Sequence, residues 1–118
     1  MKEFTGTVVS GKAEGAYYVD KYNAQFRERL GLSFFPGTLN LRADFSLPSK
    51  SISIKPAGKQ LKEVKCYKVI LNNTIEAFAV VPQMTGRDED IIEILSERNL
   101  REEMKLNDGD SVTLRFVE

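Results

Sequence analysis

Short hydrophobic runs, several of them alternating with polar residues, predict a series of β-strands along the chain. The runs are rich in β-branched and aromatic residues and are separated by Gly, Pro and Asn. They cover residues 4–10, 16–19, 38–42, 51–54, 66–71, 74–81 and 111–117. Asn72-Asn73 joins two apolar runs and predicts a hairpin. The run at 90–95 suits either a helical turn or a buried strand, and its isoleucines favour a strand.

One helix is expected near the N-terminus. Its apolar stripe, spaced at i, i+4 and i+8, consists of Tyr22, Phe26 and Leu30. Asp20 is a suitable N-cap, and Gly31 stands where a helix end favours left-handed backbone. A single further helical turn is expected at 100–105.

Six or more short strands with little helix predict an all-β fold. We expect a small closed β-barrel of six strands with one or two short helices, because closure leaves no unpaired strand edges. The 118 residues suit one domain, residues 1–118. No apolar stretch approaches the ~20 residues needed to cross a bilayer. The start, Met1-Lys2-Glu3-Phe4, lacks the pattern of a signal peptide, so we expect a cytoplasmic protein without membrane association.

The composition excludes several kinds of catalytic site within this chain. There is no histidine, so neither a Ser-His-Asp triad nor a histidine base is possible. Cys66 is the single cysteine, which excludes an internal disulfide and a zinc site of the usual Cys/His kind. Acid–base chemistry must therefore use Asp, Glu, Lys or Tyr, and a bound metal is expected to be a hard cation such as Mg²⁺.

The charge is balanced overall but unevenly distributed. The chain has 17 basic and 17 acidic residues, and this neutrality argues against a nucleic-acid partner. Residues 50–68 hold six lysines and one acid, whereas residues 88–103 hold seven acids and two arginines. Both stretches are interpreted first as solvated surface. The lysine-rich stretch has a second interpretation, as a loop that covers an anionic ligand.

Three groups of residues are more polar than a hydrophobic core requires. The first, residues 10–17, follows a strand and contains two glycines, so its backbone N–H groups suit a phosphate, although a plain β-turn has the same composition. In the second, Thr38 and Asn40 share a strand face and offer the neutral oxygen ligands that Mg²⁺ accepts, although an ordinary half-exposed strand fits equally. The third comprises Thr85 and Glu93.

Glu93 is the most interesting candidate base in a chain without histidine. It stands between isoleucines, and desolvation by apolar neighbours would raise the pKa of its carboxyl towards the range useful for proton transfer. A solvent-facing glutamate is the alternative that the sequence leaves open.

Taken in order, these features resemble the archaeal CTP-dependent riboflavin kinase family over nearly the whole chain. The matching segments are Gly6-Thr7-Val8-Val9-Ser10-Gly11, Glu14-Gly15-Ala16-Tyr17-Tyr18, Leu30-Gly31, Gly37-Thr38-Leu39-Asn40-Leu41, Val80-Val81-Pro82, Thr85, Ile91-Ile92-Glu93-Ile94, Leu100-Arg101-Glu102 and Asp108-Gly109-Asp110. The resemblance implies a six-stranded cradle-loop barrel. It also implies transfer of the γ-phosphate of CTP to the 5′-hydroxyl of riboflavin, with Mg²⁺, giving FMN and CDP.

The resemblance also implies the site residues. The nucleotide-binding residues would be Lys12, Ala13, Glu14, Gly15, Ala16 and Tyr17 of the glycine loop together with Arg98, Asn99, Leu100 and Arg101. Thr38 and Asn40 would be the Mg²⁺ ligands, and Thr85 and Glu93 would contact riboflavin. We further expect Glu93 to act as the general base and Arg101 to stabilise charge on the transferred phosphate.

Two other functions remain open at this point. Ala13 occupies the place of the family's middle glycine, which weakens nucleotide binding if that position needs positive φ, so a non-catalytic flavin- or nucleotide-binding barrel is one alternative. A DNA-binding cradle-loop regulator is the other, and the neutral charge opposes it. The expected partners are small molecules, the expected state is a monomer, and no winged-helix extension is recognised.

Overall fold

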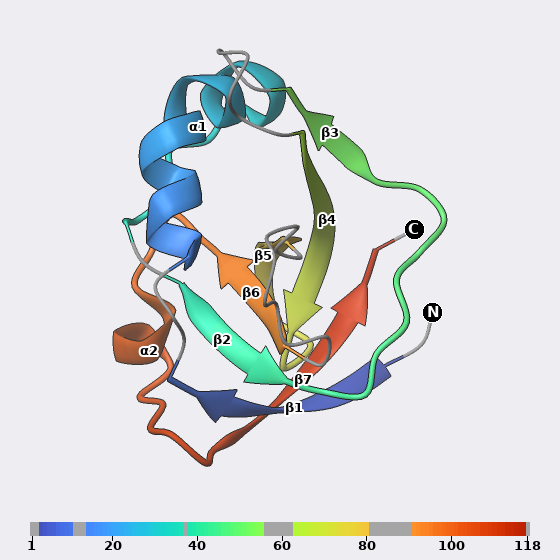
Figure 1. The fold of residues 1–118 in the computed structure, drawn as a ribbon. Coiled ribbons are helices and arrows are strands. Elements are labelled where there is room, and N and C mark those ends of the chain that lie inside the picture. The colour runs from blue at the N-terminus through green and yellow to red at the C-terminus, as the bar shows by residue number, and fades with distance from the viewer. Residues whose placement is uncertain (1–2, 11–13, 37, 56–62, 81–90, 118) are drawn as a thin grey trace.

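The part of the chain that the structure describes contains seven strands and two helices (Figure 1). The structure is a computed structural model, and it describes residues 3–10, 14–36, 38–55, 63–80 and 91–117, with only the backbone for residues 14–18. The elements are β1 (Glu3–Val9), α1 (Glu14–Leu30), β2 (Leu39–Arg42), β3 (Ile52–Ile54), β4 (Val64–Leu71), β5 (Ile75–Val80), β6 (Ile91–Leu95), α2 (Leu100–Glu103) and β7 (Ser111–Phe116).

Six of the strands close into an antiparallel barrel. Each strand pairs with the next in the order β4-β5-β6-β2-β1-β7, and β7 pairs back with β4. The seventh strand, β3, lies beside the first part of β4, where Ile52 is opposite Cys66, while β7 pairs with Val69–Leu71 at the other end of β4. The closed six-stranded barrel predicted from the sequence is confirmed.

Alternation along the strands fills the barrel with apolar side chains. The buried residues of this interior cluster are Val8, Leu39, Leu41, Tyr67, Val69, Leu71, Ala77, Ala79, Ile92, Ile94, Leu100, Val112, Leu114 and Phe116. Burial of this apolar surface is the main driving force for folding. Gly6 contributes by lacking a side chain, because a Cβ there would lie 3.0 Å from the Cβ of Leu41. A glycine therefore allows β1 and β2 to approach closely at this point.

A second buried cluster, called here the outer layer, forms where α1 packs on the outside of the barrel wall. Its buried members are Val19, Tyr22 and Phe26 of α1 with Phe34, Ile54, Val64, Cys66, Val80 and Leu95. Phe26 and Phe34 meet edge to face, with ring centroids 5.0 Å apart. In Figure 1, α1 lies across one side of the ring of strands, near β3 and β6. The helix therefore covers one sector of the wall.

The start of this helix differs from the sequence-based prediction. Asp20 was expected to cap the helix and residues 16–19 to be extended, but α1 begins at Glu14 and both predictions are wrong. Val19 is buried with Tyr22 and Phe26, so the apolar stripe begins one turn earlier than expected. Packing of this stripe on the wall outweighs the β-propensity of the residues before Asp20.

The other local predictions agree with the structure. Asn72 and Asn73 have φ of 47° and 63°, as a tight hairpin turn requires, and they connect β4 to β5. Gly31 has φ of 73° and donates its N–H to the carbonyl of Arg27, which ends α1. The ambiguous run at 90–95 is the strand β6.

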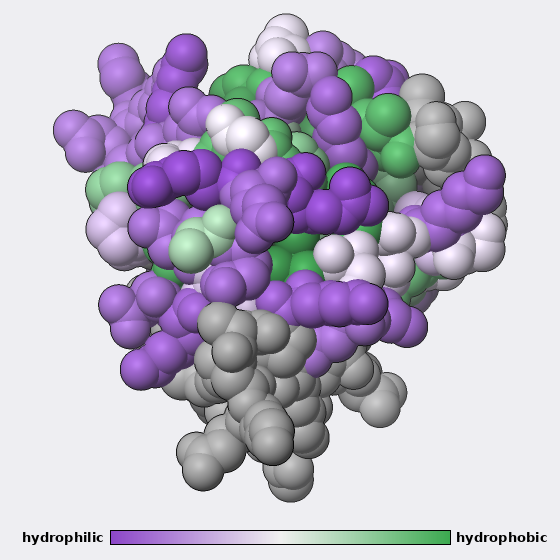
Figure 2. All heavy atoms as spheres, turned by 90° about the horizontal axis from the view of Figure 1, so that it is seen from above, coloured by the Kyte–Doolittle hydropathy of each residue, from purple (hydrophilic) through white to green (hydrophobic). Residues whose placement is uncertain are grey.

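Figure 2 shows the molecule from above relative to Figure 1. Hydrophilic residues cover most of the described surface on that face, and hydrophobic residues show through small gaps between them. Among the described large hydrophobic residues, Leu47 alone is exposed, at 40%. No helix in the described ranges is both long and apolar enough to cross a bilayer.

Candidate active site

Asn40 and Glu93 are the two buried polar residues of the described chain, and they lie side by side. They are directly opposite each other in the β2–β6 pair and are 6% and 2% exposed. Directly opposite residues in an antiparallel pair project from the same face, about 5 Å apart at Cβ. The neighbours Leu39, Leu41 and Ile92 belong to the interior cluster, so Asn40 and Glu93 project from the outside of the wall.

A row of opposed residues continues on both sides of this pair. The pairings connect Ile52, Cys66, Val80, Glu93, Asn40 and Val9 in that order across six strands. Cys66 and Val80 are fully buried members of the outer layer. The polar pair therefore interrupts an otherwise apolar row, and a buried polar pair costs stability unless it is satisfied or used.

Asn40 has an unsatisfied oxygen. Its Oδ1 is buried and accepts no hydrogen bond from any residue that the structure describes. A buried carbonyl without a donor is unusual, and an oxygen kept in this state suits a cation or a ligand donor. In the described ranges no group of three or more Cys, Asp or Glu gathers to hold a metal, so a cation here would depend on neutral oxygens and its ligand's own charge.

A cleft of about 220 Å³ brings together several of the other predicted residues. Thr38, just before β2, lies on its wall, and so do Arg98, Asn99, Leu100 and Arg101. The structure thus places one predicted metal ligand beside four predicted nucleotide residues that are about 60 positions later in the chain. Asn40 and Glu93 are not among the residues that line this cleft.

The cleft residues owe their positions to the short helix α2. Asn99 caps the helix, because its side chain accepts a hydrogen bond from the N–H of Glu102. Arg98 forms an ion pair with Glu103, with 2.6 Å between Nη1 and Oε1, and its side chain is 73% exposed. A phosphate could therefore recruit Arg98 with little rearrangement of the protein.

Arg101 is held more firmly. Its Nη2 donates to Oδ1 of Asp108 at 2.5 Å and to the carbonyl oxygen of Val9 at 3.2 Å. The other carboxylate oxygen of Asp108 accepts from the hydroxyl of Ser10 at 2.6 Å. These contacts, with that from Ser10 the largest, lower the pKa of Asp108 below its ordinary value.

Some predicted residues are not described, and one group has a different conformation. Lys12, Ala13 and Thr85 lie outside the described residues. Glu14–Tyr17 were predicted to form a loop against the nucleotide, but the structure places them in the first turn of α1. The first four amides of a helix have no partner within it, so the backbone N–H groups of that turn also suit a phosphate.

Two polar contributions were not assigned by sequence reasoning. Asp108 was interpreted as part of a turn, and the contact of Ser10 with it spans 98 positions. The signal that could have indicated a role is the Asp108-Gly109-Asp110 motif. One acidic side chain is enough to stabilise the turn, and Asp110 does so by accepting a hydrogen bond from the N–H of Asn107. The second acid, Asp108, is therefore available for another role.

Comparison with known proteins gives a family match over most of the chain. The CTP-dependent riboflavin kinase family model, which is described as a domain of unknown function (DUF120), matches residues 8–116. The chain belongs to the CTP-dependent riboflavin kinase family. The resemblance inferred from the ordered motifs is thereby confirmed.

Curated relatives of this family carry the name riboflavin kinase. One from Thermococcus kodakarensis is 39% identical over 96% of this chain, and one from Pyrococcus furiosus is 37% identical over 95%. The chain spans only 58% and 57% of those two proteins. A relative from Aeropyrum pernix, 32% identical, is matched over 98% of this chain and 96% of its own length. A protein of about this size therefore carries the same name.

Proposed function

We propose that this chain, as a single barrel domain of residues 1–118, is a CTP-dependent riboflavin kinase. The observation that carries the proposal is the buried Asn40–Glu93 pair in a member of this family, set in an apolar row where the fold alone gives no reason for two polar side chains. The name of the full-length Aeropyrum pernix relative supports it. We expect the protein to act in the cytoplasm, because its two small-molecule substrates are found there.

In the proposed reaction the 5′-hydroxyl oxygen of riboflavin attacks the γ-phosphorus of CTP. A new P–O bond gives FMN, the bond to the β-phosphate oxygen breaks, and CDP leaves with that electron pair. The hydroxyl proton passes to the carboxylate of Glu93, the general base. Phosphoryl transfer needs positioning and charge stabilisation more than covalent help, so few side chains suffice.

The residues that line the cleft bind the nucleotide. Arg101 and the more exposed Arg98, which both line the cleft, pair with the CTP phosphates, and Arg101 stabilises charge on the transferred group. Lys12–Tyr17 supply backbone N–H groups to the phosphates. Riboflavin contacts Thr85 and Glu93.

Thr38 and Asn40 are the proposed ligands of Mg²⁺. The unsatisfied, buried Oδ1 of Asn40 fits this role, because it has no hydrogen bond to give up within the described chain. When bound, Mg²⁺ neutralises phosphate charge. Two neutral ligands hold the ion weakly alone, so the site is expected to fill together with CTP.

The test of the function is product formation. The purified protein is incubated with riboflavin, Mg²⁺ and each of CTP, ATP, GTP and UTP, and FMN is separated by chromatography. We expect FMN chiefly with CTP. Binding of riboflavin and CTP without FMN would instead establish a non-catalytic barrel, and a salt-sensitive shift of DNA would favour the regulator.

The metal ligands are tested by Asn40→Ala. We expect turnover to fall about 100-fold or more, with a higher Mg²⁺ requirement and unchanged folding, because the lost oxygen accepts no hydrogen bond from the described residues. Circular dichroism measures folding, and FMN formation across a Mg²⁺ titration measures turnover and the Mg²⁺ requirement. Asn107→Ala removes the same group at an exposed turn and serves as the control. Near-normal FMN formation in Asn40→Ala would contradict the assignment.

A further inference from the structure

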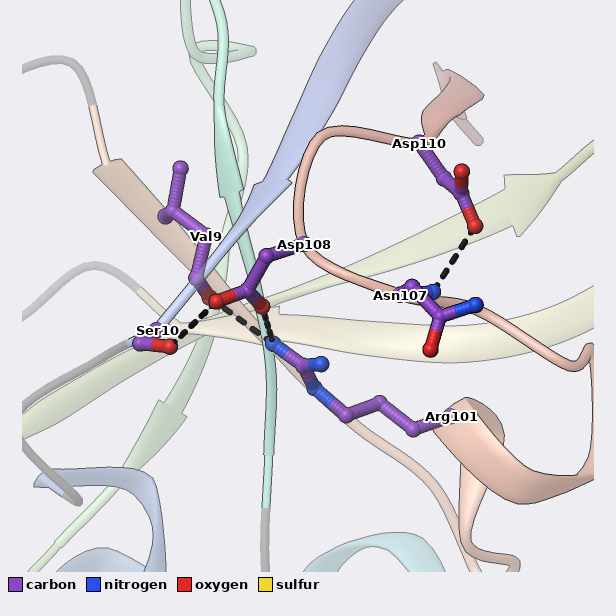
Figure 3. Close-up of polar contacts among 6 residues, drawn as sticks. All are labelled: Val9, Ser10, Arg101, Asn107, Asp108 and Asp110. Carbon is purple, nitrogen blue, oxygen red and sulfur yellow. Dashed lines mark hydrogen bonds and ion pairs between the residues drawn. The ribbon is translucent and has the colours of Figure 1, made fainter.

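The carboxylate of Asp108 connects two parts of the chain that meet only in the folded protein. Oδ1 accepts from Arg101 of α2 at 2.5 Å, and Oδ2 accepts from Ser10, just after β1, at 2.6 Å. Figure 3 shows the carboxylate between these two side chains, with Arg101 reaching past it to the carbonyl of Val9. Both acceptor atoms of one side chain are thus occupied, each by a different element.

Backbone hydrogen bonds fix the turn that carries Asp108. The N–H of Gly109 donates to the carbonyl of Val8 at 2.8 Å, and the N–H of Val8 donates to the carbonyl of Asp110 at 2.8 Å. The N–H of Leu106 donates to the carbonyl of Arg101 at 2.8 Å, which ties α2 to the same segment. Ser10, Arg101 and Asp108, called here the clamp, are therefore carried by segments whose backbones are held by hydrogen bonds.

This clamp contributes little to folding stability. The side chains of Arg101 and Asp108 are 34% and 54% exposed, and ion pairs with that much solvent contact are screened. What the clamp does is set the direction of the Arg101 guanidinium at the edge of the cleft that Thr38 also lines. It also fixes Ser10, two residues before Lys12, where the proposed phosphate loop begins.

We propose that Asp108 is a positioning residue of the nucleotide site, holding Arg101 and Ser10 in the arrangement that receives the phosphates of CTP. The role rests on the proposed function, because it assigns the cleft to the nucleotide. Asp108 acts through Arg101 and Ser10 and does not itself touch the substrate. A group held in this way loses less entropy on binding than a free side chain.

Electrostatics alone predicts the opposite effect of removing this carboxylate. Asp108 is an anion beside a site for polyphosphate, so Asp108→Asn lowers negative charge and would strengthen nucleotide binding if charge decided the outcome. Positioning predicts weaker binding, since the amide leaves one oxygen to serve two donors. The sign of the change therefore separates the two roles.

The experiment compares Asp108→Asn with Asp110→Asn. Both remove one charge from the same turn, but among the contacts described the side chain of Asp110 accepts only from the N–H of Asn107. Calorimetric titration with CDP and Mg²⁺ is expected to give about tenfold weaker binding for Asp108→Asn and a change within about twofold for Asp110→Asn. In the kinase assay KM for CTP should rise while KM for riboflavin stays constant.

Three further measurements separate positioning from a merely structural effect. In an Arg101→Ala background, Asp108→Asn should cost clearly less affinity than in the wild type, because the main partner through which it acts is gone. By NMR without nucleotide, the Nε–H of Arg101 should lose order in Asp108→Asn and keep it in Asp110→Asn. Ser10→Ala, which removes the other partner of Asp108, should weaken CDP binding by a few-fold.

The outcomes separate this role from the proposed function. Unchanged or tighter CDP binding by Asp108→Asn, with wild-type binding intact, overturns the positioning role alone. Equal weakening in both turn variants also overturns it, because a general disturbance of the turn would then explain the loss. Failure of the wild type to bind CDP or CTP overturns the proposed function, and the positioning role with it.

Discussion

The interior of the barrel and the outer layer beneath α1 are both buried, yet they differ in composition. Every buried member of the interior cluster is apolar or aromatic, and its strands contribute to it at alternate positions. The outer layer is apolar under α1, but the same row of opposed residues passes through Asn40 and Glu93. One strand, β6, supplies both regions, with Ile92 facing inwards and Glu93 outwards.

The difference separates stability from function. The strands enclose most of the interior, which meets the cleft only at Leu39, Ile94 and Leu100, so its deeper residues are selected by volume and hydrophobicity. The outside of the wall is buried only where another segment covers it. The barrel holds the backbone of a polar pair placed there, and functional sites are commonly built on rigid scaffolds of this kind.

The sharpest test of this comparison is Glu93→Gln. The amide keeps the shape of the side chain but cannot accept the hydroxyl proton, so we expect kcat for FMN formation to fall about 10²- to 10⁴-fold. The free energy of unfolding should change by only about 1 kcal/mol. Glu97→Gln, at an exposed position after the same strand, is the control. Retained turnover in Glu93→Gln would remove the general base from the mechanism.

Substitution of Ile92, the neighbour of Glu93, should lower stability and leave activity nearly unchanged. Ile92→Ala removes three buried carbons from the interior cluster and should lower the free energy of unfolding by about 2–5 kcal/mol. KM and kcat of the folded fraction should change little. Ile70→Ala, at a half-buried position of β4, should cost clearly less in the same urea titration. Equal losses would show that the interior is no more tightly packed than the outer face.

The smallest expected effect concerns Cys66, in the apolar part of the same row. Burial raises the pKa of its thiol from 9.0 to about 12. The unfolded chain therefore releases this proton first, and stability falls as the pH rises from about 9 to about 12. At pH 10 the thiol should account for about 1 kcal/mol of lost stability.

Comparison with Cys66→Ala isolates this contribution. The variant should lose less stability than the wild type between pH 8 and pH 10, measured by urea unfolding at each pH. Tyr67 is present in both proteins, and its pKa is raised chiefly by burial and to a smaller extent by Cys66, so most of its effect cancels in the difference. Parallel stability curves would contradict the burial of the thiol.

Much of the fold could be predicted because its signals are local. Asn72-Asn73 specified the hairpin, Gly31 the end of α1, and the isoleucines of β6 favoured a strand, each through backbone preferences that act over a few residues. The beginning of α1 could not be predicted in this way. Residues that favour extended structure became helical because Val19 gains burial on the wall, a contact absent from any local window.

The candidate site was predicted as a set of residues but not as an arrangement. Thr38, Asn40 and Glu93 were singled out by residue type and, with Arg101, were given roles through an ordered family resemblance; whether each performs its role stays a prediction. That Asn40 and Glu93 are opposed follows from the register of β2 on β6, which connects residues 53 positions apart. Register over such a distance is set by closure of the ring and by which faces are buried.

By itself, therefore, the sequence determined the strands, the turns, the absence of histidine chemistry and membership of the CTP-dependent riboflavin kinase family. The tertiary structure alone decided that the Glu93 carboxylate lies beside an Asn40 amide oxygen that no described residue satisfies, and that Asp108 joins Ser10 to Arg101. The physical reason is the distance along the chain over which each interaction acts. Strand and turn preferences act between neighbours in the chain, whereas a site depends on side chains that only a closed barrel brings within hydrogen-bonding distance.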